Sequence, residues 1–546
     1  MRTKRLKAAL ALVMGAALAF PQAIHAAPAP LLHKENAAGQ SGNWYTGAVP
    51  SQASSDKPVL LFVQGLHSTY ERWIGTDSYY DAAYNAGYRT AFVQLPDADG
   101  PGGDMWKNGP ILASLIRKVA AYYNVPKLNI IAHSKGGIDT QAALVYYGAS
   151  PYVNVVHQLS TPNRGSELAD MAYSTWTSWL GAIMGQQDDA VYSLQTSYMA
   201  NFRAQTDVKP EVNATKTYMS GGEGDDGIFT SYWFAHAVLP GEDDGAVSVY
   251  SAMGLPYGIQ SFTKNISHSA MARASQTWSL VQPKLKLATA ALAPSGAAMP
   301  SGQPQTAPEA ASSGQLQATL GSPSLAANAG EQDASLILRG GPVDGSSAVS
   351  FPLESGIGSV ALEVMTSRED TALSLVSPSG QVYPSAAAPA DSDPDGIFGK
   401  AVRRVFQVMQ PEAGPWSLKL DGKNDAFFAM AKIEGSASAK LKASRKVVRK
   451  GEAFQLSVDF GKPIKGSVKR PKLTKSVPGR PASFSPTREL PDLAVEGSLN
   501  MPLTAPAEPG IYNISFDVEG VNDQGEKLVR SVNYNFAVTD DQGIVN

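Results

Sequence analysis

Apolar runs alternate with amphipathic segments over the first half of the chain. Five short, continuous apolar runs have the length and composition of strands that are buried on both faces of a parallel sheet. They are residues 59–63, 90–93, 128–132, 153–156 and 215–219. Between the second and third runs, apolar residues recur at the spacing of one helix face; they are Ile111, Leu112, Leu115, Ile116 and Val119. This alternation predicts a three-layer α/β domain, which we place at residues 27–283.

The pattern changes beyond this domain. Residues 284–332 consist mainly of Ala, Pro, Ser, Gly and Gln, a composition typical of a linker. After it, short alternating runs such as residues 334–338 are separated by turn sequences, and helical periodicity is almost absent. We therefore predict one or two β-sandwich modules, divided near Ser436 into residues 333–436 and a basic, immunoglobulin-like module at residues 437–546.

The N-terminus and the composition narrow the classes of function. Four basic side chains among the first seven residues precede an apolar stretch and a small-residue cleavage site, so residues 1–26 are interpreted as a signal peptide. No later segment has the roughly 18 consecutive apolar residues of a membrane-spanning helix, and we expect a secreted, extracellular protein. The sequence has no cysteine, which excludes a thiol nucleophile and thiolate metal sites. The formal net charge of −3 gives no reason to expect nucleic acid as a partner.

A serine lies where a buried strand is predicted to turn into a helix. The apolar run that ends at Ala132 is followed by His133, Ser134, Lys135 and Gly136, and a helix-compatible segment comes next. A small residue, x, Ser, x and Gly in this context form the nucleophile elbow, in which small neighbours permit a sharp turn. The alternative is a serine in an ordinary turn. We predict Ser134 as a catalytic nucleophile.

A serine nucleophile needs a histidine as base, and in elbow enzymes the chain order is Ser, then acid, then His. Three histidines follow the elbow. His157 lies within a predicted strand and His236 lies among aromatic residues, whereas His268 lies on a polar loop. We therefore predict His268 as the base.

The acid is expected between the nucleophile and the base. Asp244, which is followed by glycine, is the preferred candidate, and Asp243 is the second. Asp225 and Asp226 remain open alternatives, because any aspartate in such a stretch can simply form a turn. Two N–H groups must also stabilise the oxyanion. We assign them to Lys135, directly after the nucleophile, and to Leu66, in the loop after the first predicted strand.

Separate blocks of the sequence resemble secreted bacterial lipases and esterases of the α/β-hydrolase superfamily. Residues 62–66 look like the family's oxyanion loop, with Gln64 where the family usually has His. Residues 132–136 match the lipase pentapeptide, with Ala132 in place of its first Gly. Residues 159–170 are similar to a further family segment. The Asp-Gly-x-Val around the family's catalytic acid matches Asp244 and the three residues after it, which favours Asp244.

The resemblance covers residues 43–283 and implies an α/β-hydrolase domain that cleaves carboxylic esters of lipids or acylglycerols. A Ser-His-Asp triad and an acyl-enzyme intermediate are implied with it. Several members of the family bind a structural calcium ion near the catalytic histidine, but no matching ligands surround His268. We therefore assign no metal and no organic cofactor.

A segment rich in aromatic residues follows the fourth predicted strand of the α/β domain. Its apolar residues fall on one helix face; they are Trp176, Trp179, Leu180, Ile183 and Met184. A lid or acyl-chain wall and an ordinary packed helix are equally compatible with this spacing. We predict substrate contacts for Trp176, Trp179 and Ile183.

The last part of the chain is strongly basic. Residues 440–488 contain 14 Lys and Arg side chains and 2 acidic ones, a local charge of +12. Such a segment could contact an anionic cell surface. A solvated β-surface whose lysines protect strand edges is the alternative, which we favour narrowly.

Two other functions remain open on the sequence. The linker and β modules would also suit an extracellular polyester depolymerase of the polyhydroxyalkanoate type, in which the modules adsorb to polymer. In a different class, the chain could be a cell-surface binding protein with an inactive hydrolase domain.

Overall fold

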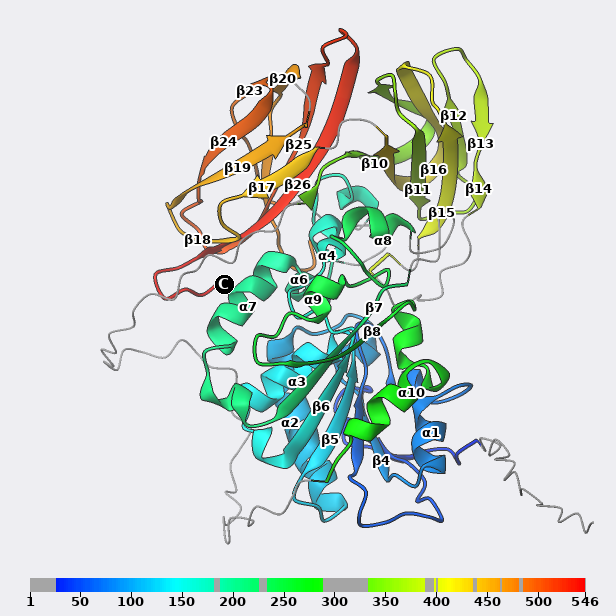
Figure 1. The fold of residues 1–546 in the computed structure, drawn as a ribbon, viewed down its shortest axis with the longest axis vertical. Helices are drawn as coiled ribbons and strands as arrows, with labels where there is room; N and C mark the ends of the chain where they lie inside the picture. The colour runs from blue at the N-terminus through cyan, green and yellow to red at the C-terminus, as the bar shows by residue number, and fades with distance from the viewer. Residues whose placement is uncertain are drawn as a thin grey trace, which may run out of the picture.

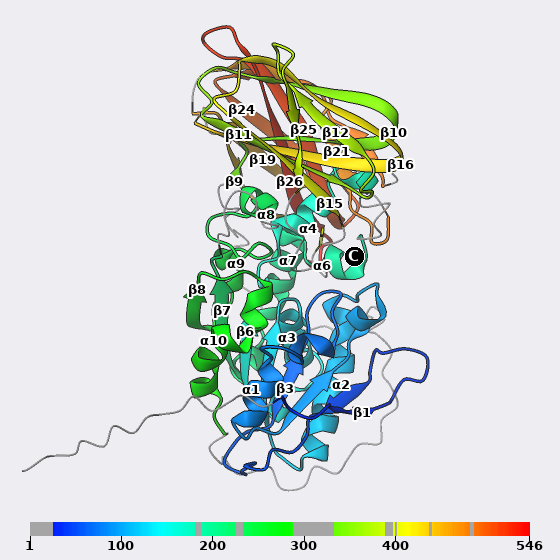
Figure 2. The same ribbon diagram turned by 90° about the vertical axis from the view of Figure 1, so that its right-hand side faces the viewer.

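The computed structural model describes residues 26–180, 187–224, 233–287, 332–387, 397–398, 401–435, 439–461, 464–480 and 485–545. The first half of the chain forms an α/β domain, and the second half forms two adjacent β modules at one end of it (Figures 1 and 2). The predicted signal peptide lies almost wholly outside the described residues, as does most of the predicted linker.

The α/β domain is built on an eight-stranded sheet with the order β1-β2-β4-β3-β5-β6-β7-β8. Its strands are β1 (Leu31–His33), β2 (Trp44–Thr46), β3 (Leu60–Val63), β4 (Thr90–Val93), β5 (Leu128–His133), β6 (Val153–Leu159), β7 (Lys216–Gly222) and β8 (Ile259–Lys264). The pairs from β4 to β8 are parallel, whereas β1 and β2 add an antiparallel edge. All five predicted runs are found among the strands of this sheet.

Alternate residues of the central strands point to opposite layers of helices. Leu61 and Val63 of β3 pack with the layer that holds α2 and α3, and Leu60 and Phe62 pack with the layer that holds α1 and α10. Because both faces are covered, the strands read as continuous apolar runs rather than as alternating ones. The predicted three-layer architecture is confirmed (Figure 2).

The helices fall into the two layers and a third group. The helices are α1 (Tyr79–Asn85), α2 (Met105–Tyr122), α3 (Gly136–Val145), α4 (Glu167–Ala172), α6 (Asp189–Ser193), α7 (Thr196–Thr206), α8 (Trp233–Val238), α9 (Val249–Ala252) and α10 (Ala274–Val281). Short 3-10 helices are η1 (Tyr70–Trp73), η2 (Pro96–Asp99), η3 (Ser150–Tyr152), η4 (Pro210–Asn213), η5 (Ser269–Ala272) and η6 (Gln282–Lys284). We call α4, α6, α7 and α8 the cap helices, because they lie between the sheet and the β modules (Figure 1).

The first β module contains a seven-stranded sheet. Its strands are β10 (Leu336–Leu353), β11 (Ser359–Thr366), β12 (Ala372–Val376), β13 (Val382–Pro384), β14 (Ala386–Ala387), β15 (Val402–Met409) and β16 (Gly414–Glu434). The long strands β10 and β16 pair along their length, with a register shift between Val343 and Gly345. Trp416 lies fully buried in the core of this module.

The second β module is an eleven-stranded sheet, which also includes β9 (Gln332–Asp333). Its other strands are β17 (Lys440–Ala443), β18 (Val447–Arg449), β19 (Ala453–Asp459), β20 (Lys465–Val468), β21 (Lys472–Lys475), β22 (Thr487–Glu489), β23 (Leu493–Glu496), β24 (Ser498–Thr504), β25 (Gly510–Val521) and β26 (Lys527–Thr539). The predicted β-sandwich class of the C-terminal half is confirmed. Ser436, the predicted boundary, lies outside the described residues.

The two modules are joined by a buried ion pair. Arg530 of β26 pairs with Glu354, which follows β10, and both side chains are almost fully buried. Ser531 also accepts a hydrogen bond from the backbone N–H of Leu338 at 2.9 Å. Among the helices of the described residues, none combines the length and apolar character needed to cross a membrane.

Candidate active site

Ser134 lies at the turn between β5 and α3, where the chain has almost no free volume. Its backbone has a φ of 54°, in the left-handed region that non-glycine residues rarely adopt. A Cβ on Gly136 would overlap the carbonyl oxygen of Gln64, and a Cβ on Gly137 would overlap Thr161. A Cβ on Gly65 would lie 2.8 Å from the Cβ of Ser134. The small residues around the serine are therefore required by close contacts between three backbone segments.

His268 and Asp244 form a buried pair near this turn. Nδ1 of His268 lies 2.9 Å from Oδ2 of Asp244. The backbone N–H of His268 donates to the carbonyl of Asp244 at 2.8 Å. The other carboxylate oxygen accepts from the N–H groups of Ala246 and Val247 at 3.1 and 2.8 Å. These contacts fix the orientation of both side chains.

His133 links this pair to the segment that carries Ser134. The rings of His133 and His268 have centroids 4.7 Å apart, and Nε2 of His133 lies 2.9 Å from the carbonyl oxygen of His268. Burial lowers the pKa of His133 well below its ordinary value, and the charges of Arg72 and His268 lower it further. The ring is therefore neutral, and its Nε2–H donates to the carbonyl. The elbow and the His268 loop are held together by this hydrogen bond.

The other histidines and acids occupy different positions. His157 is buried in β6 with Nε2 2.8 Å from Oγ of Ser220, and burial lowers its pKa to about 3. Nδ1 of His236 lies 2.6 Å from Oδ1 of Asp243. Asp243 is thus a partner of His236, whereas Asp244 is the partner of His268. The alternative acids Asp225 and Asp226 lie outside the described residues.

The loop after β3 brings Leu66 beside the elbow, since Gly65 packs against Ser134. His67 has a φ of 50°, and its Nε2 lies 2.5 Å from Oδ2 of Asp188 at the start of α6. Burial alone would raise the pKa of Asp188, but the hydrogen bond and charge of His67 lower it overall. This contact joins the loop to the cap helices. No sequence pattern indicates it, because the two residues are separated by 121 positions.

Two triacylglycerol lipases are similar in sequence to part of the chain. A triacylglycerol lipase of Burkholderia plantarii is 30% identical over 129 residues, which cover 22% of this chain and 34% of that protein. A triacylglycerol lipase of Pseudarthrobacter phenanthrenivorans is 31% identical over 124 residues, which cover 22% of this chain and 37% of that protein. The chain therefore spans only about a third of the length of these relatives. No protein-family model matches the chain.

A solved structure resembles nearly the whole fold. A Bacillus licheniformis lipase in its propeptide form has a TM-score of 0.68 and 24% identity, and the match covers 93% of this chain and 99% of that one. The chain has the α/β-hydrolase fold. The sequence motifs predicted a resemblance to bacterial lipases and esterases, and these similarities of sequence and fold confirm it.

The residues predicted to contact substrate are only partly described. Trp176 is half-buried and packs against an apolar cluster, and Trp179 is 40% exposed. Ile183 and Met184 lie outside the described residues. The role of the three side chains in substrate binding stays a prediction.

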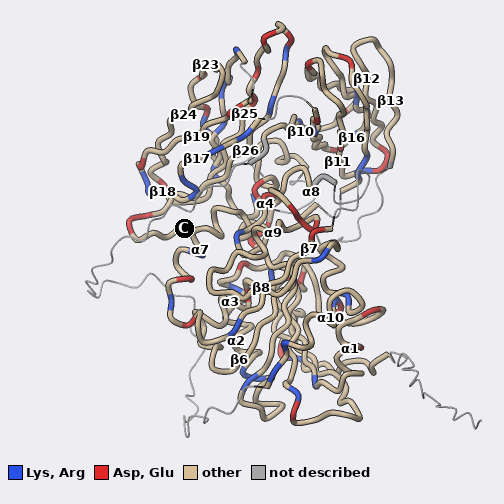
Figure 3. The backbone as a smooth tube through the Cα atoms, in the orientation of Figure 1, with Lys and Arg blue, Asp and Glu red and all other residues tan. Residues whose placement is uncertain are grey.

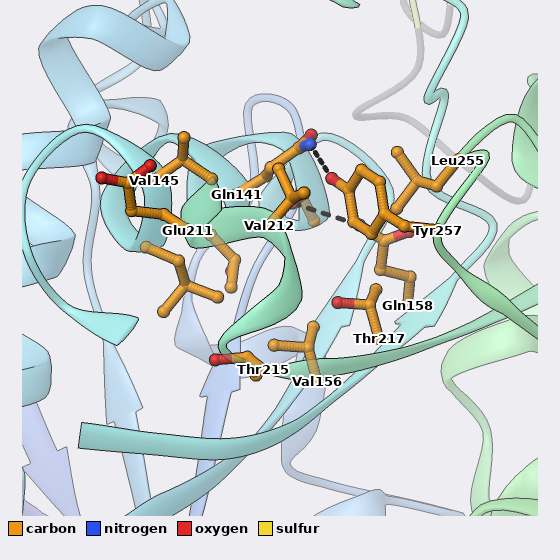
Figure 4. A pocket seen from close by; sticks show the side chains of 13 residues that line it. Gln141, Val145, Val156, Gln158, Glu211, Val212, Thr215, Thr217, Leu255 and Tyr257 are labelled. Carbon is orange, nitrogen blue, oxygen red and sulfur yellow. Dashed lines mark hydrogen bonds between the residues drawn. The ribbon is translucent and has the colours of Figure 1, made fainter. Parts of the chain in front are cut away.

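A cavity beneath α3 is too small for an acyl chain. Its volume of about 20 Å³ suits roughly one water molecule. Figure 4 shows Gln141 and Tyr257, which are joined by a hydrogen bond, at one wall of this cavity. Among the described residues of the chain, no group of three or more His, Asp and Glu side chains has the arrangement of a metal site.

The β modules pack directly on the cap helices of the α/β domain. Leu168, Leu180 and Val191 from the cap region share one apolar cluster with Leu338 and Ile511 of the modules. Polar contacts surround this cluster. The side chain of Asn535 on β26 accepts from the N–H of Ser197 at 3.1 Å and donates to Gln195 at 3.0 Å. Nζ of Lys446 lies 3.7 Å from Asp170.

Glu167 on α4 lies at this junction, with its Oε2 atom shielded from solvent and without a hydrogen bond from any described residue. A cavity of about 50 Å³ separates it and Asp170 from β10 and β26. Burial and the neighbouring charge of Asp170 raise the pKa of Glu167 to about 7. This carboxyl is therefore protonated in the folded protein at mildly acidic pH.

The variant Glu167→Gln is expected to lose less stability than the native protein when the pH is raised. The folded-state pKa lies above the ordinary value of 4.5, so the folded protein binds this proton more tightly than the unfolded chain. The free energy of unfolding then falls as the pH rises from 4.5 to about 7, by up to about 3 kcal/mol for this buried group. Melting temperatures measured at about pH 5 and about pH 8 should differ less for the variant than for the native protein.

Glu489→Gln is the matched control, because Glu489 is exposed on β22. This variant should keep the native pH dependence. Equal changes in melting temperature for the native protein and Glu167→Gln would contradict the assignment.

The basic segment at residues 440–488 is partly neutralised in the fold. Lys450 pairs with Asp541 at 2.6 Å and Lys469 pairs with Asp492 at 3.2 Å, while Lys475 pairs with Glu508. All three acids lie outside the segment in sequence. Figure 3 shows acidic and basic positions interspersed along the second β module. This distribution favours the interpretation as a solvated β-surface, and contact with an anionic cell surface stays a prediction.

Proposed function

We propose that the chain is a secreted carboxylic-ester hydrolase that cleaves lipid or acylglycerol esters. Ser134 is the nucleophile, His268 the base and Asp244 the acid. The contact between His268 and Asp244 carries this proposal, since it selects one His-Asp pair and joins it through His133 to the elbow. The similarity of about a fifth of the chain to triacylglycerol lipases supports the class of substrate.

Each group has a defined task in this reaction. Oγ of Ser134 attacks the ester carbonyl while Nε2 of His268 removes its proton, and Asp244 holds the ring and stabilises its charge. His268 then protonates the leaving alcohol, and water, activated by His268, hydrolyses the acyl-enzyme. The N–H groups of Leu66 and Lys135 stabilise the oxyanion. Both are available for this purpose, because neither donates a hydrogen bond to any other described residue.

Substitutions of the triad test the proposal. Ser134→Ala should abolish hydrolysis of p-nitrophenyl butyrate and covalent labelling by a fluorophosphonate. Asp244→Asn should lower kcat by about 10⁴-fold, because an amide no longer selects the productive ring tautomer of His268. Asp243→Asn is the control for a neighbouring acid and should keep most of the activity.

The same variants distinguish the catalytic proposal from a binding function, and a comparison of substrates distinguishes it from a polyester depolymerase. A native protein that is neither labelled nor active, or a Ser134→Ala variant labelled as well as the native protein, would falsify the catalytic proposal. Hydrolysis of a polyhydroxyalkanoate film with no activity on emulsified triglyceride would instead favour the polyester depolymerase.

We propose further that the β modules restrict the entry of bulky substrates by holding the cap helices. The close approach of β10 to the cap supports this role, since a Cβ on Gly340 would overlap the carbonyl oxygen of Trp176. The solved Bacillus licheniformis lipase of similar fold is described as a propeptide form. Removal or displacement of the modules would then increase access to Ser134.

A single added methyl group tests this restriction. Gly340→Ala should weaken the packing of the module on the cap by about 1–3 kcal/mol and raise kcat/KM for a long-chain p-nitrophenyl ester more than for the butyrate. Gly341→Ala is the matched control, because a Cβ there would make an ordinary contact of 3.6 Å with Phe427. Unchanged chain-length preference in Gly340→Ala, with a lowered melting temperature, would argue against the restriction.

A further inference from the structure

A buried charge cluster lies directly behind the elbow and is not used by the proposed triad. Nζ of Lys135 lies 3.0 Å from Oδ2 of Asp97 and 3.0 Å from Oδ2 of Asp139. Asn108 of α2 donates to both carboxylates, at 2.7 Å to Asp97 and 2.9 Å to Asp139. All four side chains are almost fully buried. The cluster therefore joins η2, the first turn of α2 and the first turn of α3.

The cluster is charged despite its burial. Burial alone favours the neutral amine, but Asp139 and Asp97 raise the pKa of Lys135 above its ordinary value. Burial also raises the pKa of Asp139, although Lys135 opposes this change. A buried ion pair seldom stabilises a fold more than apolar side chains of the same size. The position of the cluster directly beside Ser134 points instead to a role in the geometry of the elbow.

The same cluster contacts both segments that supply the oxyanion donors. Lys135 carries one donor on its own backbone, and its side chain is fixed by Asp97 and Asp139. Oδ1 of Asp97 also accepts a long hydrogen bond, 3.4 Å, from the N–H of His67, the residue after Leu66. One carboxylate thus lies between the two backbone segments. The space around it is tightly filled, because a Cβ on Gly102 would come within 2.8 Å of Oδ1 of Asp97.

We propose that the side chain of Lys135 is a positioning group for the oxyanion hole, which acts by tying the first turn of α3 and the Leu66 loop to Asp97. The inference rests on the proposed ester hydrolysis at Ser134 and names a residue that sets its geometry. Substrate touches only the backbone N–H of Lys135, while the ammonium group stays in the cluster. The hydrogen bonds among these buried charges hold the two N–H groups in the orientation that the transition state requires.

Lys135→Met tests this role, because methionine keeps an unbranched side chain and removes the charge. With p-nitrophenyl butyrate, kcat should fall about 100-fold, as expected for a displaced oxyanion donor, with KM within about twofold of the native value. The inhibition constant of a soluble alkylboronic acid, whose tetrahedral adduct places an oxygen in the oxyanion hole, should rise in parallel. Rates are normalised to the number of sites labelled by fluorophosphonate at completion, so that unfolded protein does not count.

Conservative variants and a control separate positioning from stability. Lys135→Arg restores the charge and should recover kcat to within about tenfold of the native value. Asp139→Asn is nearly isosteric and should lower kcat about tenfold. If Lys135→Met does not fold, the result for Asp139→Asn tests the positioning role in its place. Arg530→Met removes another buried cation, between the two β modules, and should lower the melting temperature without lowering kcat per labelled site.

The outcomes distinguish this inference from the proposed function. A native enzyme that is labelled at Ser134 and active, together with native kcat per site in Lys135→Met or in Asp139→Asn, overturns the positioning role alone. A fall of kcat in Arg530→Met as large as that in Lys135→Met also overturns it, because the effect would then follow stability. A native protein that is neither labelled nor active overturns the proposed function itself.

Discussion

Between β5 and α3 the chain reverses its direction over two residues, and at Ser134 it must adopt a left-handed backbone conformation to do so. Three backbone segments meet at this turn: the elbow, the loop at Gly65 and the residues at Thr161. Side chains larger than hydrogen at Gly65, Gly136 or Gly137 would collide with them. The position of the oxyanion loop relative to the serine is set by the same contacts. The rest of the candidate site is assembled around this crowded turn.

The two sides of the elbow differ in the charge of the side chains that are buried there. On one side, neutral His133 links the elbow to the His268 loop through a single hydrogen bond. On the other side, Lys135 is buried together with Asp97 and Asp139, and the side-chain amide of Asn108 donates a hydrogen bond to each carboxylate. In the first arrangement, the side chain that links the elbow to the proposed base is uncharged. The second can hold backbone segments rigidly, because each ionic hydrogen bond in a dry environment is strong and directional.

The cap helices have two sets of contacts, one with each part of the molecule. His67 and Asp188 tie the cap to the loop beside Ser134. An apolar cluster and the hydrogen bonds of Asn535 tie it to the β modules. The cap helices therefore contact both the loop beside Ser134 and the β modules. Glu167 lies between the modules and the cap, where burial and the charge of Asp170 raise the pKa of its carboxyl to about 7.

Local patterns were sufficient to predict five of the eight strands of the α/β sheet, the helix after the elbow and the class of the C-terminal half. Each of these depends on residues close in sequence, whose burial on one or both faces leaves a direct pattern of apolar positions. Strands β1, β2 and β8 were missed. Leu31 and Leu32 of β1 are exposed and no residue of β8 is fully buried, so neither of these two strands leaves such a pattern. The choice between Asp243 and Asp244 also stayed open on the residues alone. It depends on which side chain reaches His268 and which reaches His236.

By itself, the sequence determined the chemical groups and their order: a serine between small residues, an acidic turn after it and a histidine on a later polar loop. Only the tertiary structure decided which of these groups meet. The sheet order β5-β6-β7-β8 brings the loops after β7 and β8 to the end of β5, so that residues more than a hundred positions apart come within hydrogen-bond distance. The pairs of His67 with Asp188 and of Lys135 with Asp97 arise in the same way. Spacing along the chain carries no information on them, because a side-chain contact depends on the packing of whole elements and on the volume left between them.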